Sequence, residues 1–337
     1  MRLTHRNAVW LALAALALLT AASLMLGRYQ IGPGELARLL WSKLSGEAHG
    51  LPPMAETVLF GVRLPRVAAA LLVGAALAAA GAAYQGLFRN PLVSPDILGV
   101  SSGAALGAVL GIFFSLEVVM IQAMAFAGGL LAVAIVYAVA SAVRNHEPIL
   151  VLVLSGVVVG TLLGACISLL KYLADPYNQL PAITFWLLGS LASTTRADTL
   201  SAAPMVLLGL VPLVLLRWRI NLLALGDEEA RALGVETRVI RPVVIVAATL
   251  VTAAVVSISG IVGWIGLVVP HLARALVGPD FARLLPVAMA MGASFLLLVD
   301  DLARILAAIE VPLGVLTAFL GAPFFLALLA RAGREWQ

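Results

Sequence analysis

Apolar runs long enough to cross a lipid bilayer recur along the sequence, and they constrain the fold more than any other feature. A membrane-spanning helix takes ~20 predominantly apolar residues. Only 11% of the 337 residues are charged and 62% are hydrophobic, whereas a soluble domain carries about 25% charged residues. Backbone groups in lipid must be hydrogen-bonded within the protein, so each run is expected to form a helix. The sequence therefore predicts an all-α polytopic membrane protein, with residues 1–337 forming a single domain.

Ten runs qualify as spans, and an eleventh apolar run, at residues 182–190, is only about half a span long. A re-entrant or interfacial helix fits this shorter run. The ten expected spans are residues 8–26, 63–88, a run that opens at Gly99, and residues 119–142, 149–171, 199–216, 242–258, 264–277, 285–302 and 312–330.

Basic residues at the ends of the chain predict its orientation, because arginine enrichment in short loops marks the cytoplasmic side. Arg2 and Arg6 precede the first span, and Arg331 and Arg334 follow the last one. Both termini are therefore expected in the cytoplasm, and residues 27–62 are expected to form a polar external segment. The N-terminus also has the form of a cleavable signal peptide, but an uncleaved first span is the favoured interpretation.

A polar stretch at residues 222–241 interrupts the apolar pattern, within an expected cytoplasmic segment at residues 218–240. Asp227 is suited to cap a short helix, and Gly234 is suited to stop it. The helix expected at residues 227–233 is too short to span a bilayer. Two interpretations stay open: a plain loop, or a structured lever on which another protein pushes.

Charged residues near the outer ends of the spans also have two interpretations each. Arg63 and Arg66 lie one turn apart, and they either reach toward lipid headgroups or present two cations to an acidic partner. Asp300 and Asp301 are candidates for an intramembrane proton site. Arg304, one turn further on, favours a neutralised structural pair instead.

Glycines at i+4 spacing predict close helix packing, because they leave a smooth face for a neighbouring helix. One set is Gly99, Gly103, Gly107 and Gly111, and a second set is Gly156, Gly160 and Gly164. A weak internal repeat is also visible, since Gly81, Gly86-Leu87 and Pro91-Leu92 resemble Gly260, Gly266-Leu267 and Pro270. The two copies start on opposite sides of the expected membrane, as inverted repeats of transporters do.

Several classes of function lack support in the sequence. The motifs of a zinc protease, a serine hydrolase, a Walker A loop and a dinucleotide site are not found. The single cysteine, Cys166, rules out an intrachain disulfide, and the four histidines do not pair at metal-ligand spacing. No basic run with interleaved aromatics supports nucleic-acid binding. The chain is therefore not expected to be an enzyme, and it must take energy from a gradient or from a partner.

Motifs spread over most of the chain resemble the FecCD family of ABC-importer permeases, which includes vitamin B12, haem and ferric-siderophore permeases. The motifs occur in the order typical of that family. They are RLPR at residues 63–66, GLFRNPL at 86–92, PDILG at 95–99, FWLLG at 185–189, LGDEEARALGV at 225–235, GLVVPH at 266–271, DLAR at 301–304, PLG at 312–314 and GAP at 321–323.

The resemblance implies a multi-pass protein of the bacterial cytoplasmic (inner) membrane that works as a homodimer. Its implied partners are two cytoplasmic ABC ATPase subunits, which bind ATP and magnesium, and a periplasmic or extracellular substrate-binding protein. No cofactor or metal is implied for this chain itself. The implied function is import of a metal chelate: a ferric siderophore, haem or a cobalamin. The alternatives are an ABC importer of an oxyanion such as molybdate, and a proton-coupled transporter that uses Asp300 or Asp301.

The resemblance also assigns roles to individual residues. Arg63, Arg66 and Arg304 match arginines that dock the binding protein, and Asn90 and Leu92 match residues that close the pathway at its cytoplasmic end. Trp264 stands where the family often has phenylalanine. Family members also have a gate at the cytoplasmic start of the fifth span, where residues 149–151 of this chain are wholly apolar. The residues that match the ATPase-coupling segment are Leu225, Gly226, Asp227, Glu228, Glu229, Ala230, Arg231, Ala232, Leu233, Gly234 and Val235.

Overall fold

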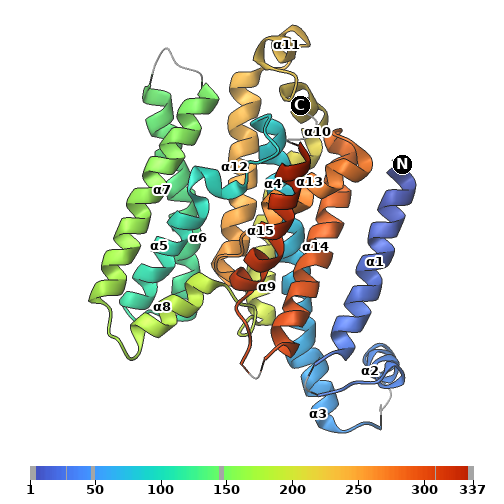
Figure 1. Ribbon diagram of the computed structural model, residues 1–337. Coiled ribbons are helices and arrows are strands. Elements are labelled where there is room, and N and C mark those ends of the chain that lie inside the picture. The colour runs from blue at the N-terminus through green and yellow to red at the C-terminus, as the bar shows by residue number, and fades with distance from the viewer. Residues whose placement is uncertain (1–4, 28, 47–49, 144–147, 308, 333–337) are drawn as a thin grey trace.

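In the computed structural model, the chain forms a bundle of helices (Figure 1). The structure describes residues 5–27, 29–46, 50–143, 148–307 and 309–332. Its helices are α1 (His5–Met25), α2 (Pro33–Ser45), α3 (Pro53–Glu56), α4 (Leu64–Leu87), α5 (Val100–Phe113), α6 (Val118–Ala142), α7 (Pro148–Leu173), α8 (Gln179–Leu188), α9 (Arg196–Leu215), α10 (Arg217–Leu223), α11 (Asp227–Ala232), α12 (Thr237–Ser259), α13 (Ile265–Val277), α14 (Phe281–Ile305) and α15 (Leu313–Ala332).

Seven helical stretches in the described part of the chain are long and apolar enough to cross a membrane. Four shorter apolar helical stretches lie in α5, α8, α13 and α15. The polytopic, all-helical class is therefore confirmed for the described residues. Ten crossings are reached only when α5, α13 and α15 are counted as spans, so the number ten stays a prediction. Helix α8 matches the half-length run expected at residues 182–190.

The second span begins earlier than the sequence suggested. Helical structure starts at Pro53 and continues through a π-helical segment, Thr57–Arg63, directly into α4. Pro65 therefore lies inside a continuous helix, where it supplies no N–H to the ladder. The backbone N–H of Leu64 donates to the carbonyl of Leu59, five residues earlier, and this wider turn lies just before the proline. π-Turns of this kind occur mostly inside helices, often at functional sites.

Helix α4 is the centre of the bundle, and glycines bring its neighbours close. A Cβ added at Gly81 would lie 1.9 Å from the carbonyl oxygen of Gly266 in α13. A Cβ added at Gly74 would lie 2.3 Å from the carbonyl oxygen of Gly292 in α14. At both crossings the backbones touch, so any side chain would push the helices apart. The two glycine motifs of the expected repeat thus pack on each other, while the inverted relation itself stays a prediction.

The two glycine faces predicted from i+4 spacing are used to different extents. Gly103 and Gly107 of α5 pack against the backbone of α6, as expected. Gly99 is not part of that helix face, because it precedes α5 with a φ of +77°. In α7, Gly156 contacts the carbonyl of Ile97, but a Cβ on Gly164 would meet nothing within 4 Å. The spacing predicted packing correctly for α5 and only partly for α7.

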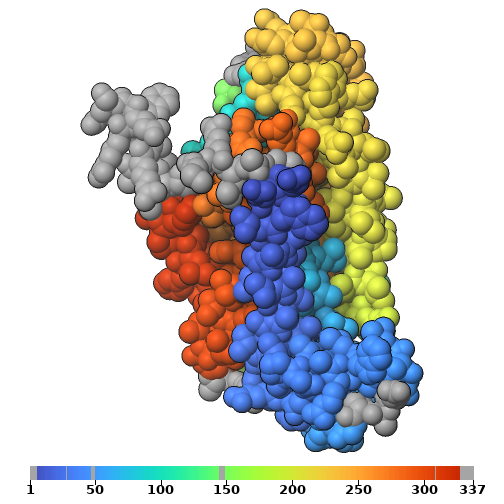
Figure 2. Space-filling view, turned by 90° about the vertical axis from the view of Figure 1, so that its right-hand side faces the viewer, coloured from blue at the N-terminus to red at the C-terminus, as the bar shows by residue number. Residues whose placement is uncertain are grey.

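The bundle has two distinct ends. Helix α11 lies at one end and α2 and α3 lie at the other, as Figures 1 and 2 show. Helix α1 runs from the side of α11 toward α2. The expected external segment, residues 27–62, thus contains two helices and the π-helical segment. Helix α12 begins at Thr237, so Arg238 and Arg241 belong to the span rather than to a loop. Arg2 and Arg334, used above for orientation, lie outside the described residues.

Candidate functional site

A short helical unit joins α9 to α12 at one end of the bundle. It consists of α10 and α11, which are seven and six residues long. Ile220 and Leu223 of α10 and Ala230 of α11 are buried. These apolar contacts hold the unit against the ends of the spans, because burying apolar surface is favourable. The stretch is therefore helical and not a plain loop, while its role as a lever for another protein stays a prediction.

The end of α11 is fixed by backbone hydrogen bonds. The N–H of Gly234 donates to the carbonyl of Arg231, and the N–H of Val235 donates to the carbonyl of Ala230. This pair of bonds is the Schellman arrangement, which needs a left-handed residue directly after the helix. Gly234 supplies it with a φ of +83°, so the predicted stop at Gly234 is confirmed. Val235 is buried and anchors the exit.

The start of α11 differs from the prediction. Gly226, with a φ of +139°, precedes the helix, and Asp227 is its first residue rather than its cap. The carboxylate of Asp227 instead forms an ion pair with Arg241 in α12, with 2.5 Å between Oδ1 and Nη2. The carboxylate of Glu229 folds back over Gly226, where a Cβ would lie 2.3 Å from Oε2. The Asp227 side chain, which was expected to cap α11, thus binds Arg241 of α12 instead.

This unit exposes both apolar and charged side chains. Leu225 is 56% exposed and Leu233 is 53% exposed. Glu228, Glu229 and Arg231 are also exposed. Leu225 lies before α11 and Leu233 directly follows it, and exposed leucines beside charges of both signs are typical of a surface that a protein partner covers.

The turn after α4 lies at the same end of the bundle. The side chain of Asn90 accepts a hydrogen bond from the backbone N–H of Leu92 at 2.9 Å, and both residues are exposed. This Asx-type contact replaces a backbone turn. Arg89, before it, has a positive φ of +51°. The two predicted gate residues therefore form one local turn at the end of α4.

Helix α10 connects the short helical unit to this turn. A Cβ added at Gly86, near the end of α4, would lie 3.3 Å from the side chain of Ile220 in α10. Arg89 also reaches the unit, since its Nη1 would lie 3.5 Å from a Cβ on Gly226. A displacement of α11 and α10 would therefore act directly on the end of α4 and the turn that follows it.

A cluster of charged side chains lies at the opposite end of the bundle, and Arg66 is at its centre. Arg66 is 5% exposed. Its Nε donates to both carboxylate oxygens of Asp300 at 3.0 Å. Its two terminal nitrogens donate to the two oxygens of Glu310 at 2.9 Å each. A bidentate arginine–carboxylate pair of this kind is among the strongest charge-assisted contacts.

Arg304 occupies the other side of the cluster. Its Nε lies 3.5 Å from Asp300, and its Nη2 contacts Asp301 and the hydroxyl of Ser23. The Ser23 hydroxyl in turn donates to Asp301 at 2.7 Å. Asp300 is fully buried and Asp301 nearly so. Both carboxylates therefore have arginine partners, which confirms the neutralised pairing favoured from the sequence.

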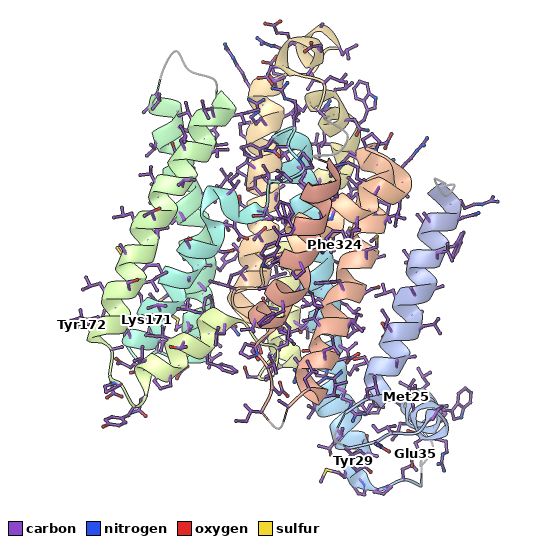
Figure 3. All side chains as sticks on the ribbon, viewed as in Figure 1. Met25, Tyr29, Glu35, Lys171, Tyr172 and Phe324 are labelled. Atoms are coloured by element: carbon purple, nitrogen blue, oxygen red, sulfur yellow. The ribbon has the colours of Figure 1, made fainter. Side chains whose placement is uncertain are left out.

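Arg63 is buried too, but its partners are backbone carbonyls. It donates to Leu24 at 2.8 Å, to Met25 at 3.0 Å, and to Tyr29. Figure 3 shows Met25 and Tyr29 at the end of the molecule opposite α11. Arg63 thus satisfies carbonyls at the C-terminus of α1, where a positive charge is favourable. The side chains of Arg63 and Arg66 thus bind within the chain instead of reaching lipid headgroups, and their docking to an acidic partner stays a prediction.

The sequence did not indicate that Ser23 belongs to the cluster or that Glu310 pairs with Arg66. Glu310 lies after α14, and its side chain is 36% exposed. A signal existed, because a carboxylate beside a span end needs a nearby cation. The pairing itself joins residues 244 positions apart, and spacing carries no information over such a separation.

Trp264 packs against α15. The ring of Trp264 packs over Gly321 in α15 and lies edge-on to Phe325, with 6.3 Å between ring centroids. The backbone of Trp264 has a φ of +71° at the start of α13. Among the described residues, no group of three or more His, Cys, Asp or Glu side chains could hold a metal ion.

Comparisons with known proteins agree on one family. Residues 15–331 match the FecCD transport family. The chain is 42% identical to the molybdate import system permease protein MolB of Haemophilus influenzae, over 93% of this chain and 92% of that protein. It is 43% identical to the cobalamin import system permease protein BtuC of Halobacterium salinarum, over 83% of this chain and 75% of that protein.

A solved structure supports the same assignment. It is described as an inward-facing conformation of a metal-chelate type ABC transporter, and it aligns with a TM-score of 0.87 at 38% identity, covering 97% of this chain and 99% of that one. The identity and the coverage exceed what a shared fold alone requires. The protein therefore belongs to the FecCD transport family and is the permease subunit of an ABC transporter, not an enzyme.

Proposed function

We propose that the chain is the transmembrane subunit of an ATP-driven, binding-protein-dependent importer that moves a metal chelate into the cytoplasm. The observation that carries the proposal is the rigid unit α10–α11, with its exposed Leu225 and Leu233, in contact with the end of α4. An ATPase can drive a membrane pathway only through a contact that does not deform. The Schellman end of α11, the ion pair to α12 and the buried Ala230 meet that requirement.

In this proposal, Leu225 to Val235 are the ATPase-coupling segment and Asn90 and Leu92 are the cytoplasmic gate. Closure of two ATPase subunits, which bind ATP and magnesium, moves α11, and α10 transmits the movement through Ile220 to the end of α4. Helix α11 then faces the cytoplasm, as do the two chain termini. A large chelate passes because the spans offer few charges to hold it, and conduction needs binding weak enough to release the substrate.

Docking of an external binding protein belongs to the opposite end of the bundle. Arg63, Arg66 and Arg304 are the proposed docking arginines, although each already has partners within the chain. Glu310 is the most exposed member of the cluster, so it is the contact that a partner reaches first. A carboxylate of the binding protein would replace Glu310 on Arg66, while Asp300 keeps the guanidinium in place.

A second copy of the chain is the proposed partner within the membrane. Helix α7 leaves several large apolar side chains uncovered, including Leu154, Val158 and Leu162, and nothing described lies within 4 Å of a Cβ at Gly164. A glycine on an uncovered helix face suits close approach of another helix. A homodimer would place two such faces together around a central pathway.

Two substrate classes are represented among the relatives of this chain. The cobalamin permease of H. salinarum and the metal-chelate transporter favour a chelate such as a ferric siderophore, haem or a cobalamin. Molybdate is the second candidate, because the MolB relative matches 93% of the chain. The proton-coupled alternative has less support, since Asp300 and Asp301 are both paired with arginines and a proton carrier needs a carboxylate free to titrate.

The test is purification of the tagged chain from its native membrane in mild detergent, followed by reconstitution with the ATPase and binding protein that accompany it. ATP-dependent uptake that persists with a protonophore supports the importer. Uptake that continues without the ATPase and collapses with the protonophore contradicts it. Mass spectrometry of the ligand carried by the binding protein separates a chelate from molybdate.

A further inference from the structure

A basic pocket opens beside the short helical unit, between α6, α7, α11 and α12. Its volume is about 470 Å³. Arg231, Arg238 and Arg241 line it, together with the carboxylate of Asp227 and the hydroxyl-bearing residues Tyr137, Ser141 and Thr237. Three cations against one carboxylate leave the described lining with a net charge of +2, and the hydroxyl groups add neutral hydrogen-bonding capacity. The pocket is therefore suited to an anion.

Arg241 is the best-placed cation in the wall. Its side chain is 14% exposed, and its Nη2 is held by Asp227 at 2.5 Å. Its Nε is buried and has no hydrogen-bond partner among the described residues. A buried N–H without a partner is unfavourable, so most such groups in folded proteins are satisfied by protein, water or ligand. Arg241 therefore has hydrogen-bonding capacity that the described residues do not use.

An apolar groove continues directly from the basic pocket along α6 and α12. Its volume is about 610 Å³, and its other walls are Leu130, Val133, Ala134, Ala138, Val246 and Thr249. Tyr137, Ser141, Pro242 and Ile245 line both spaces. The two therefore form one continuous site, with a cationic end near α11 and an apolar channel that runs toward the middle of the spans.

We propose that this site binds an anionic phospholipid, with its phosphate at the arginines and one acyl chain in the groove. Basic pockets between spans are known features of lipid-headgroup recognition, and a small free anion would have no use for the adjoining apolar groove. The lipid would brace Asp227 and Arg241, the pair that joins α11 to α12. The assignment to the cytoplasmic leaflet rests on the proposed function, but the site itself does not.

The first experiment measures lipid retention by the full-length permease without ATPase or substrate. The protein is reconstituted in nanodiscs of phosphatidylcholine that contain phosphatidylglycerol, and native mass spectrometry after extraction counts the retained lipids. We expect phosphatidylglycerol to be retained in preference to phosphatidylcholine. Arg238→Gln with Arg241→Gln is expected to weaken its binding on the order of 30-fold, at ~1 kcal/mol for each lost charge near a membrane surface.

Matched controls separate this site from general attraction. Arg217→Gln with Arg219→Gln removes two exposed charges from α10, outside the pocket, and is expected to leave retention unchanged. Arg238→Gln alone spares the Asp227 ion pair, so it still tests the site if the double variant folds poorly. Asp227→Asn removes the only carboxylate among the described lining residues and is expected to increase retention.

The groove has its own test, which keeps every charge. Ala134→Trp fills the apolar groove, whereas Leu131→Trp places the same bulk elsewhere on α6. Only Ala134→Trp is expected to release the lipid. Equal loss with Leu131→Trp or with Arg217→Gln/Arg219→Gln would overturn the proposal, as would displacement of the lipid by inorganic phosphate alone. Failure of ATPase to accompany the chain would contradict the proposed function but leave this result standing.

Discussion

Asp227, the first residue of α11, forms an ion pair with Arg241 in the second turn of α12, with 2.5 Å between the carboxylate and the guanidinium. The two side chains are 31% and 14% exposed, so water reaches the pair only in part. This contact joins a short helix to a membrane span across the loop that separates them. The ion pair therefore fixes the position of α11 relative to α12.

Breaking this pair is expected to uncouple transport from ATP hydrolysis. Asp227→Ala removes a contact worth about 1 kcal/mol, which lowers the equilibrium constant for the correctly oriented α11 roughly fivefold. Substrate uptake in proteoliposomes is expected to fall several-fold while the ATPase still binds. The exchanged pair, Asp227→Arg with Arg241→Asp, restores the attraction and is expected to recover part of the uptake. No recovery in the exchanged pair would mean that the ion pair is not the coupling element.

Gly226→Ala is expected to displace α11. The φ of +139° at Gly226 disfavours any side chain, and the new Cβ would lie 2.3 Å from the Glu229 carboxylate. We expect less ATPase to copurify with the variant, at unchanged permease yield. Gly34→Ala is the control, because its Cβ would meet nothing within 4 Å. Equal ATPase recovery from both variants would contradict the role of α11.

Gly81→Ala is expected to destabilise the whole bundle. Its Cβ would lie 1.9 Å from the Gly266 carbonyl oxygen, so α4 and α13 would have to separate. Overpacking a close helix contact costs about 1–3 kcal/mol, and backbone contact places this site at the upper end. The measurement is the unfolding temperature in detergent. Gly164→Ala, which has open space in a single chain, is expected to leave that temperature unchanged in the monomer.

The two carboxylates that hold Arg66 are expected to differ in their importance for stability. Asp300→Asn leaves Arg66 and Arg304 buried without a full counter-charge, and breaking a buried ion pair costs roughly 3–5 kcal/mol. Glu310→Gln affects a partly exposed group and is expected to cost about 1 kcal/mol or less. Chemical denaturation of the purified protein measures both changes. Similar decreases in the free energy of unfolding for the two variants would show that Asp300 is no more important than Glu310 for holding Arg66.

Glu310→Gln also tests the docking proposal. If a carboxylate of the binding protein replaces Glu310 on Arg66, removing the internal competitor is expected to tighten docking by several-fold, with the largest gain at low salt. Surface plasmon resonance of the binding protein on immobilised permease measures the change. Weaker docking in Glu310→Gln would indicate that Glu310 itself contacts the partner. Glu35→Gln is the charge control, because it removes one negative charge at the same end but outside the cluster (Figure 3).

Much of the local structure was predictable from short patterns. The spans, the half-length helix α8 and the stop at Gly234 follow from apolar run length and from residue types with strong conformational preferences. The start of α11 could not be predicted in this way, because the Asp227 carboxylate had two possible partners, the backbone of its own helix and Arg241. The tertiary contact to α12 decided between them, and the capping preference of aspartate was too small to prevail.

Apolar run length and family motifs are local properties, so a helical membrane protein of the FecCD type can be predicted from the residue order alone. The partners of the charged residues depend on contacts between distant parts of the chain. Arg66 faces inward because Asp300, 234 residues away, meets it where α4 crosses α14. The arginines of α11 and α12 form a pocket only because α6 and α7 close its other side. A buried charge is stable only beside its counter-charge, and folding alone brings such distant partners together.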